Sequence, residues 1–86
     1  MYKIEFDKKV DKQIKKLDSK VKKQILDYLE FRVLKDPFAF GKSLVADKSG
    51  LWRYRVNNYR VICDIKKDKL VVLVVKVGHR SIVYNK

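Results

Sequence analysis

The segment formed by residues 51–63 constrains the fold more than any other part of the chain. It consists of two runs of alternating apolar and polar residues, separated by Asn57-Asn58. Asparagine tolerates the positive φ angles of a tight turn, so the sequence predicts a β-hairpin with a two-residue loop. In such a hairpin Val56 pairs with Tyr59, and Arg55 lies opposite Arg60.

The predicted hairpin has two chemically different faces. The first face is apolar and aromatic, and we expect it to face the core; it carries Trp52, Tyr54, Val56, Tyr59, Val61 and Cys63. The second face carries Arg53, Arg55 and Arg60. Like charges opposite one another destabilise a hairpin, so this pattern indicates a site for an anion such as phosphate. The alternative is that Arg53 and Arg55 are only polar positions of an exposed strand.

Length and cysteine content limit the class of protein. The 86 residues are enough for one domain, spanning residues 1–86, that closes a core without a disulfide or a metal. The single cysteine, Cys63, falls on the predicted core face and is expected to be a buried structural thiol. No apolar run is long enough to span a membrane, and the N-terminus lacks a signal-peptide pattern. We therefore expect a soluble cytoplasmic protein with no membrane partner.

The chain is strongly basic. Lysine and arginine total 22 against 10 acidic residues, which gives a net charge of +12. Such an excess predicts attraction to polyanions: nucleic acid, the ribosome or an acidic protein. Charge does not choose among these partners, and many of the lysines before residue 50 fit solvent-facing positions of helices.

The residues before the hairpin predict a strand and two helices. Residues 2–6 alternate with period two, as a strand does. Asp7 can cap a first helix. A second amphipathic helix begins at Asp18 or Ser19 and ends before Pro37. The apolar stripe of the first helix is Val10, Ile14 and Leu17. Because the connection is short, we expect an antiparallel helix pair.

An almost unbroken aliphatic run at residues 70–77 predicts a central strand after the hairpin. If the turn pairs Ile65 with Leu70, the arginine face also carries an apolar patch suited to docking. That patch would be Ile62, Val71, Leu73 and Val75. The predicted fold is α+β: an N-terminal strand, a two-helix hairpin and a three-stranded antiparallel meander, with the helices on one face of a small twisted sheet.

The end of the predicted last strand carries residues that suit phosphate chemistry. Gly78 lets the chain bend, so His79, Arg80 and Tyr84 can lie near the arginine face. Arginine binds phosphate at two points and neutralises charge in a transition state, whereas tyrosine and histidine move protons. Tyr84 as an anchor of the terminus and His79 as an ordinary surface residue are the alternatives. With one histidine and one cysteine, a zinc site is not expected, and we predict catalysis without a metal or other cofactor.

Several segments of the chain are similar to a known family. They are Leu51-Trp52-Arg53-Tyr54-Arg55-Val56, Asn58-Tyr59-Arg60-Val61-Ile62, Val77-Gly78-His79-Arg80, and Tyr84. These segments resemble the RelE/ParE superfamily of bacterial type II toxins, and the helix pair and Gly41-Lys42-Ser43-Leu44 fit the same pattern. Resemblance to the RelE branch implies a ribosome-dependent endoribonuclease that cuts mRNA. It also implies silencing by an acidic antitoxin in a toxin–antitoxin hetero-oligomer.

The resemblance also implies roles for individual residues. The ribose 2′-hydroxyl would attack the adjacent phosphate, giving a cyclic phosphate and a free 5′-hydroxyl. Arg60 would hold the scissile phosphate, and Arg80 would stabilise the transition state. Tyr84 would orient the substrate or handle a proton.

Two residues depart from the pattern of the family. Arg53 and Arg55 stand where the best-studied member has two lysines, one of them proposed as the general base. Arginine binds phosphate but does not accept a proton at ordinary pH. Our hypothesis from the sequence is that His79 or Tyr84 serves as the base.

Two other functions compete with the nuclease. The ParE branch shares the fold, acts on DNA gyrase and generally lacks this set of arginines and tyrosine. A non-catalytic nucleic-acid-binding module is the third possibility. Retention of Arg60, Arg80 and Tyr84 favours the nuclease.

Overall fold

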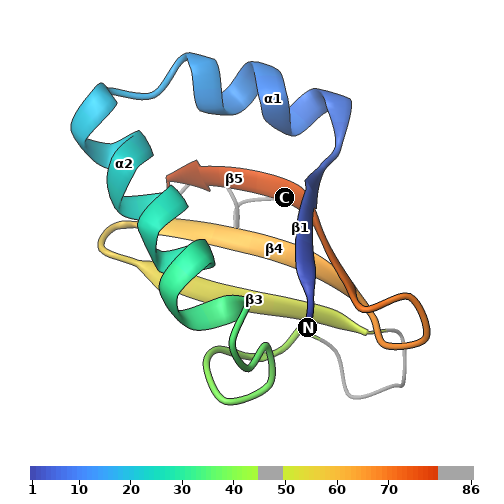
Figure 1. The fold of residues 1–86 in the computed structure, drawn as a ribbon. Coiled ribbons are helices and arrows are strands. Elements are labelled where there is room, and N and C mark those ends of the chain that lie inside the picture. Colours follow the sequence, from blue (N-terminus) through green and yellow to red (C-terminus); the bar gives the residue numbers. More distant parts are fainter. Residues whose placement is uncertain (45–49, 80–86) are drawn as a thin grey trace.

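The computed structural model describes residues 1–44 and 50–79, and it shows two helices packed against one sheet (Figure 1). The elements in chain order are β1 (Lys3–Phe6), α1 (Lys8–Lys15), α2 (Ser19–Tyr28), the π-helical turn η1 (Leu29–Val33), β2 (Lys42–Ser43), β3 (Leu51–Val56), β4 (Tyr59–Lys66) and β5 (Val71–His79). This arrangement confirms the predicted α+β class, including the meander of β3, β4 and β5.

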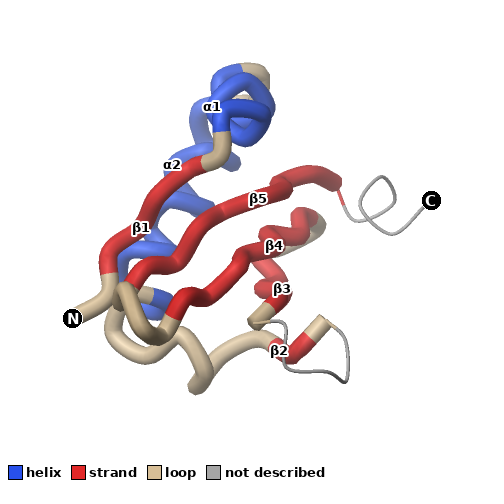
Figure 2. The backbone as a smooth tube through the Cα atoms, turned by 90° about the vertical axis from the view of Figure 1, so that its right-hand side faces the viewer, coloured by secondary structure: helices blue, strands red, loops and turns tan. Residues whose placement is uncertain are grey.

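The sheet has five strands in the order β1-β5-β4-β3-β2. All its pairs are antiparallel except β1 and β5, which run parallel. The backbone amides of Lys3 and Asp7 donate to the carbonyl oxygens of Leu70 and Val74, each at 3.0 Å, and continue this parallel pairing at both ends. Figure 2 shows the helices on one side of the strands. Strand β1, which pairs in parallel with β5, and the short strand β2 extend the predicted meander into a mixed sheet.

The helices follow the predicted apolar stripes. Asp7 caps α1, because its carboxylate accepts a hydrogen bond from the Lys9 amide at 3.0 Å, and Val10 and Ile14 are buried on the sheet side. The predicted second helix is α2 followed by η1, whose buried residues are Leu29 and Val33. Within residues 1–44 and 50–79 no helix is long and apolar enough to cross a membrane.

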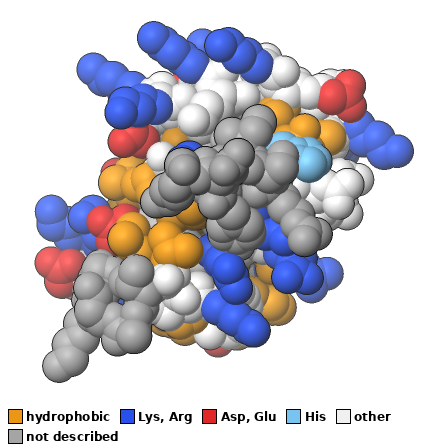
Figure 3. Space-filling view, turned by 180° about the vertical axis from the view of Figure 1, so that it is seen from behind, with side chains coloured by type: hydrophobic (Ala, Val, Ile, Leu, Met, Phe, Trp, Pro, Cys, Tyr) orange, Lys and Arg blue, Asp and Glu red, His pale blue; other side chains and the backbone are white. Residues whose placement is uncertain are grey.

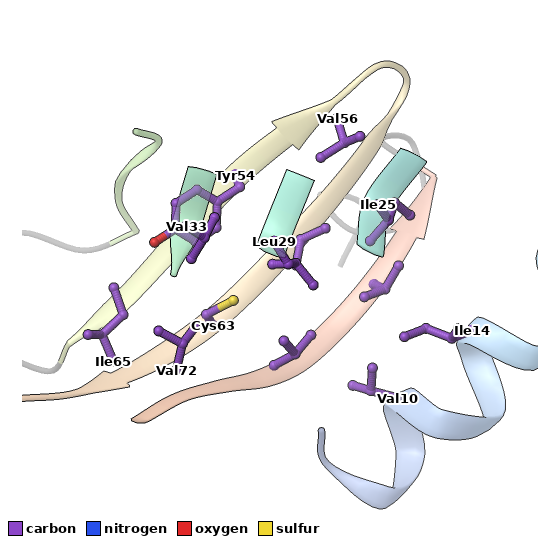
Figure 4. Close-up of a cluster of buried hydrophobic side chains, with 13 residues drawn as sticks. Val10, Ile14, Ile25, Leu29, Val33, Tyr54, Val56, Cys63, Ile65 and Val72 are labelled. Atoms are coloured by element: carbon purple, nitrogen blue, oxygen red, sulfur yellow. The ribbon is translucent and has the colours of Figure 1, made fainter. Parts of the chain in front are cut away.

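The core fills the space between the helices and the sheet (Figure 4). Its buried members are Val10, Ile14, Ile25, Leu29, Val33, Tyr54, Val56, Val61, Cys63, Ile65, Val72, Val74 and Val77. Trp52 and Tyr59 are partly buried against this cluster, so the predicted core face of the hairpin is confirmed. Cys63 is a buried free thiol, also as predicted, and burial raises its pKa to about 12.

The predicted register between β4 and β5 is wrong. Ile65 pairs with Val72, not with Leu70, because Lys66 and Val71 form the last pair before the turn. The register then shifts between Ile62 and Cys63, which leaves Val75 as the extra residue of a β-bulge. Lys76 therefore pairs with Ile62. Val71 and Leu73 keep their predicted face.

Candidate anion-binding site

The site is built on the hairpin of β3 and β4, whose pairing follows the sequence. Val56 pairs with Tyr59 and Arg55 with Arg60. Asn57 has a φ of 55°, in the left-handed region that the turn requires. Its side-chain amide donates to the Gln24 side-chain oxygen at 2.6 Å, so the tip of the hairpin is fixed to α2.

The three arginines of the hairpin line one hollow on the side of the sheet away from the helices. Arg53, Arg55 and Arg60, together with Gly41 and Lys42, surround a volume of about 270 Å³. Figure 3 views the molecule from this side and shows apolar side chains beside those of Lys and Arg. The structure thus brings together the arginines that the hairpin register placed on one face.

Arg60 lies deepest in this hollow, which we call the arginine hollow. It is only 4% exposed, whereas Arg53 is half-buried and Arg55 is exposed. Its Nη1 donates to the Tyr59 carbonyl oxygen at 3.2 Å. A guanidinium retained in a protein interior beside two others favours an anionic ligand, since planar N–H pairs match the oxygens of phosphate.

Lys42 is the lining residue that the sequence analysis missed. It lies on β2 directly opposite Arg53 of β3, so both residues share a face of the sheet. In the sequence Lys42 is one lysine of an irregular, lysine-rich segment, and alternation gives no signal there. The motif Gly41-Lys42 just before the hairpin is the one hint available.

Two hydrogen bonds and one close backbone approach place the segment before Lys42 against β3. The Tyr54 hydroxyl donates to the Pro37 carbonyl oxygen at 2.6 Å, and Trp52 Nε1 donates to the Phe40 carbonyl oxygen at 2.7 Å. Gly41 has a φ of +69°, and a Cβ there would collide with the carbonyl oxygen of Arg53. A close approach of this kind requires glycine. Tyr54, whose pKa is raised by burial, thus serves the scaffold of the site.

His79 is not among the described residues that line the arginine hollow. It pairs with Tyr59 at the end of β5, and the two rings meet edge to face with centroids 5.6 Å apart. Tyr59 packs against the core on the helix side of the sheet. His79 therefore extends from the face opposite to that of Arg60. Arg80 and Tyr84, the other two predicted site residues, lie outside the residues that the structure describes.

The sequence matches one family along nearly its whole length. Residues 4–84 match the family described as the ParE toxin of the type II toxin–antitoxin system, parDE. The chain belongs to this family, and hence to the RelE/ParE superfamily of type II toxins. It is a toxin of a type II toxin–antitoxin system.

Solved structures of RelE toxins share the fold. The isolated RelE toxin of E. coli is 28% identical with a TM-score of 0.77, over 92% of this chain and 84% of that one. The toxin of the E. coli toxin–antitoxin complex RelBE is 27% identical with a TM-score of 0.78, over 92% of this chain and 96% of that one. The complex RelBE2 of Mycobacterium tuberculosis is 22% identical with a TM-score of 0.82, over 92% of this chain and 98% of that one. No curated protein matches the sequence significantly.

Proposed function

We propose that this toxin is a ribosome-dependent endoribonuclease that cleaves mRNA. The observation that supports the proposal best is the arginine hollow, in which three guanidinium groups from two strands surround one space. RNA cleavage through the 2′-hydroxyl places extra negative charge on the phosphate in the transition state, and fixed cations stabilise that charge. The likeness to RelE structures agrees with this assignment.

The proposed reaction needs no metal ion. The 2′-oxygen attacks the adjacent phosphorus, the bond from phosphorus to the 5′-oxygen breaks, and the products are a 2′,3′-cyclic phosphate and a 5′-hydroxyl. Arg60, deepest in the hollow, holds the scissile phosphate, while Arg53 and Arg55 bind its outer oxygens or the neighbouring phosphate. The guanidinium groups supply the positive charge that metal ions supply in other nucleases.

Two roles come from the resemblance to the RelE branch. Arg80 stabilises the transition state, and Tyr84 orients the substrate or handles a proton. His79 is the weaker candidate for proton transfer, since it pairs with Tyr59 and extends from the helix side of the sheet. Positioning of the codon by the ribosome supplies part of the rate through orientation.

The proposed physiological partner is an acidic antitoxin. Two of the similar structures are complexes of a toxin with its antitoxin, and this chain carries a net charge of +12. An acidic segment laid over the arginine hollow would neutralise it and block RNA. We place this hetero-oligomer, the ribosome and mRNA in the cytoplasm.

A ParE-like inhibitor of DNA gyrase without nuclease activity is the second candidate. The name of the matching family favours it, while the arginine hollow favours the nuclease. A basic module that binds nucleic acid without cleaving it is the third candidate.

Primer extension on mRNA after brief expression, beside a supercoiling assay with purified gyrase, separates these functions. We expect cuts within codons and normal supercoiling. Arg60→Ala and Arg80→Ala should each reduce cleavage about 100-fold or more, the usual cost of removing a donor that stabilises an oxyanion. Lys15→Ala, an exposed change on α1, is the matched control and should leave the cuts unchanged. Intact transcripts together with inhibited supercoiling would establish the ParE-like function instead.

A further inference from the structure

The arginine hollow poses a chemical problem for the proposed nuclease, on which this inference rests. Attack by the 2′-hydroxyl requires a group that accepts its proton. Arg53, Arg55 and Arg60 stay protonated at any ordinary pH and cannot accept one. Tyr84 lies outside the residues that the structure describes, and His79 is not among the described residues that line the hollow.

Lys42 is the one residue among the described lining of the hollow that can accept a proton. Gly41 has no side chain, and the other lining residues are the three arginines. A lysine amine, unlike a guanidinium, exchanges its proton readily and serves as a general base in enzymes. The lining chemistry therefore leaves a single group with the required property.

The fold places Lys42 where the reaction needs it. Its strand partner is Arg53, and directly opposed residues of an antiparallel pair have Cβ atoms about 5 Å apart. Trp52 holds Phe40, two residues before Lys42, through the Phe40 carbonyl oxygen, and Gly41 lets the backbone approach β3. Lys42 is thus fixed beside the arginines on the same face, at the wall of the hollow that β2 forms.

The surroundings of Lys42 are cationic. Strand β2 packs against β3, and the charged groups that face Lys42 across the hollow are Arg53 and Arg55 of β3 and Arg60 of β4. No carboxylate is part of the described lining, so none competes with the substrate phosphate for the amine. RNA bound by the arginines would bring its ribose hydroxyl to the same space.

We propose that Lys42 is the general base of this toxin. Its Nζ takes the proton of the 2′-hydroxyl, and the 2′-oxygen forms a bond to phosphorus. The bond to the 5′-oxygen breaks, and that oxygen takes up a proton from water. Lys42 then releases its proton to water. In the RelE branch the proposed base is a lysine at one of the positions that Arg53 and Arg55 occupy on β3 of this chain. Here the amine of Lys42 on β2 takes over that function.

The decisive variant is Lys42→Arg, which keeps the positive charge and removes the base. We expect single-turnover cleavage of ribosome-bound mRNA to fall about 100-fold or more in both Lys42→Arg and Lys42→Ala, the usual contribution of a general base. Binding to the programmed ribosome should be retained in Lys42→Arg. The pH dependence of the wild-type rate should show a titration step that is missing in Lys42→Arg. Lys15→Ala is the control for loss of a lysine, and thermal unfolding shows that each variant is folded.

Two outcomes would overturn the assignment, and each is distinct. If the wild type cleaves and Lys42→Arg cleaves equally well with the same titration step, Lys42 only binds phosphate and the base is elsewhere. In that case His79→Ala and Tyr84→Phe identify it, and the nuclease function stands. If the wild-type protein makes no cuts, the nuclease function itself is wrong.

Discussion

The two faces of the sheet follow opposite physical rules. The face toward α1 and α2 is apolar, and its side chains form one buried cluster with those of the helices. The opposite face sets Arg55 against Arg60 and places Arg53 and Lys42 as a second cationic pair. The first face stabilises the fold. The second face carries like-charge repulsion, which the proposed binding of an anion would offset.

The magnitudes explain why the chain tolerates this arrangement. Burying one aliphatic side chain of the core stabilises the fold by about 1.5 to 3 kcal/mol. A pair of like charges opposite one another on a sheet costs at most about 1 kcal/mol. A few buried side chains on the helix side therefore offset the repulsion on the other. Substitutions on the two faces should therefore change the free energy of unfolding by amounts that differ in both size and sign.

The largest effect is expected for Leu29→Ala on the helix side. Leu29 is 1% exposed, and truncating a buried leucine leaves a cavity that lowers the free energy of unfolding by about 2 to 5 kcal/mol. Phe31→Ala, two residues further along η1, removes a side chain that is 57% exposed and should change it by less than about 0.5 kcal/mol. Urea unfolding measures both. Equal losses would mean that η1 does not bury Leu29.

The second effect is a loss of stability at high pH that originates on the same buried face. Burial raises the pKa of Cys63 from about 9 to about 12. Below pH 9 the thiol is protonated in both the folded and the unfolded state. Between the two pKa values only the unfolded state releases its proton. The free energy of unfolding therefore falls as the pH rises, by about 1.4 kcal/mol per pH unit for one such group.

The variant Cys63→Ala tests this explanation. Urea unfolding at pH values below and above 9 should show a shallower pH dependence than in the wild type. Part of the dependence should remain, because burial also raises the pKa of Tyr54. An unchanged slope in Cys63→Ala would show that the thiol is accessible to solvent. Arg53, Arg55 and Arg60 should contribute nothing here, since guanidinium groups stay charged throughout.

The smallest effect, and the one with opposite sign, is expected for Arg55→Thr on the arginine face. Removing one of two opposed charges and keeping a strand-forming residue should raise the free energy of unfolding by about 0.5 kcal/mol. The same change should weaken cleavage. The gain should shrink at high salt, where repulsion is screened. Lys3→Thr is the control, because Lys3 lies opposite Val71. A destabilised Arg55→Thr would mean that the guanidinium supports the fold.

The hairpin could be predicted because its signals are local. Asn57-Asn58 sets the turn, and strict alternation assigns each side chain to a face. The register of Arg55 and Arg60 follows from counting alone. The same argument identified the buried thiol of Cys63.

The register of β5 could not be predicted from the sequence. The run at residues 70–77 is aliphatic on both faces except at Lys76, so no polar position marks the bulge at Val75. This shift also decides the position of His79. Gly78 pairs with Arg60, and the next residue therefore falls on the other face. A count that ignores the bulge does not give this result.

The place of Lys42 depends on contacts between distant segments. The carbonyl groups of Pro37 and Phe40 accept hydrogen bonds from Tyr54 and Trp52, and aromatic residues of a predicted core face give no reason to expect such partners. In the sequence Gly41 belongs to the segment Gly41-Lys42-Ser43-Leu44, which fits the family pattern, but that pattern does not indicate a close backbone approach to β3. The strand pairing that brings Lys42 to Arg53 becomes evident only in the folded chain.

The parallel pairing of β1 with β5 has a consequence for the time at which the toxin matures. β5 lies between β1 and β4 in the sheet, and Gln13 of α1 also accepts a hydrogen bond from its Val77 amide. The first elements to leave the ribosome thus have no partner until residues 71–79 have been translated. Because domains form as their contacts become available during synthesis, the sheet cannot be completed before residues 71–79 have left the ribosome.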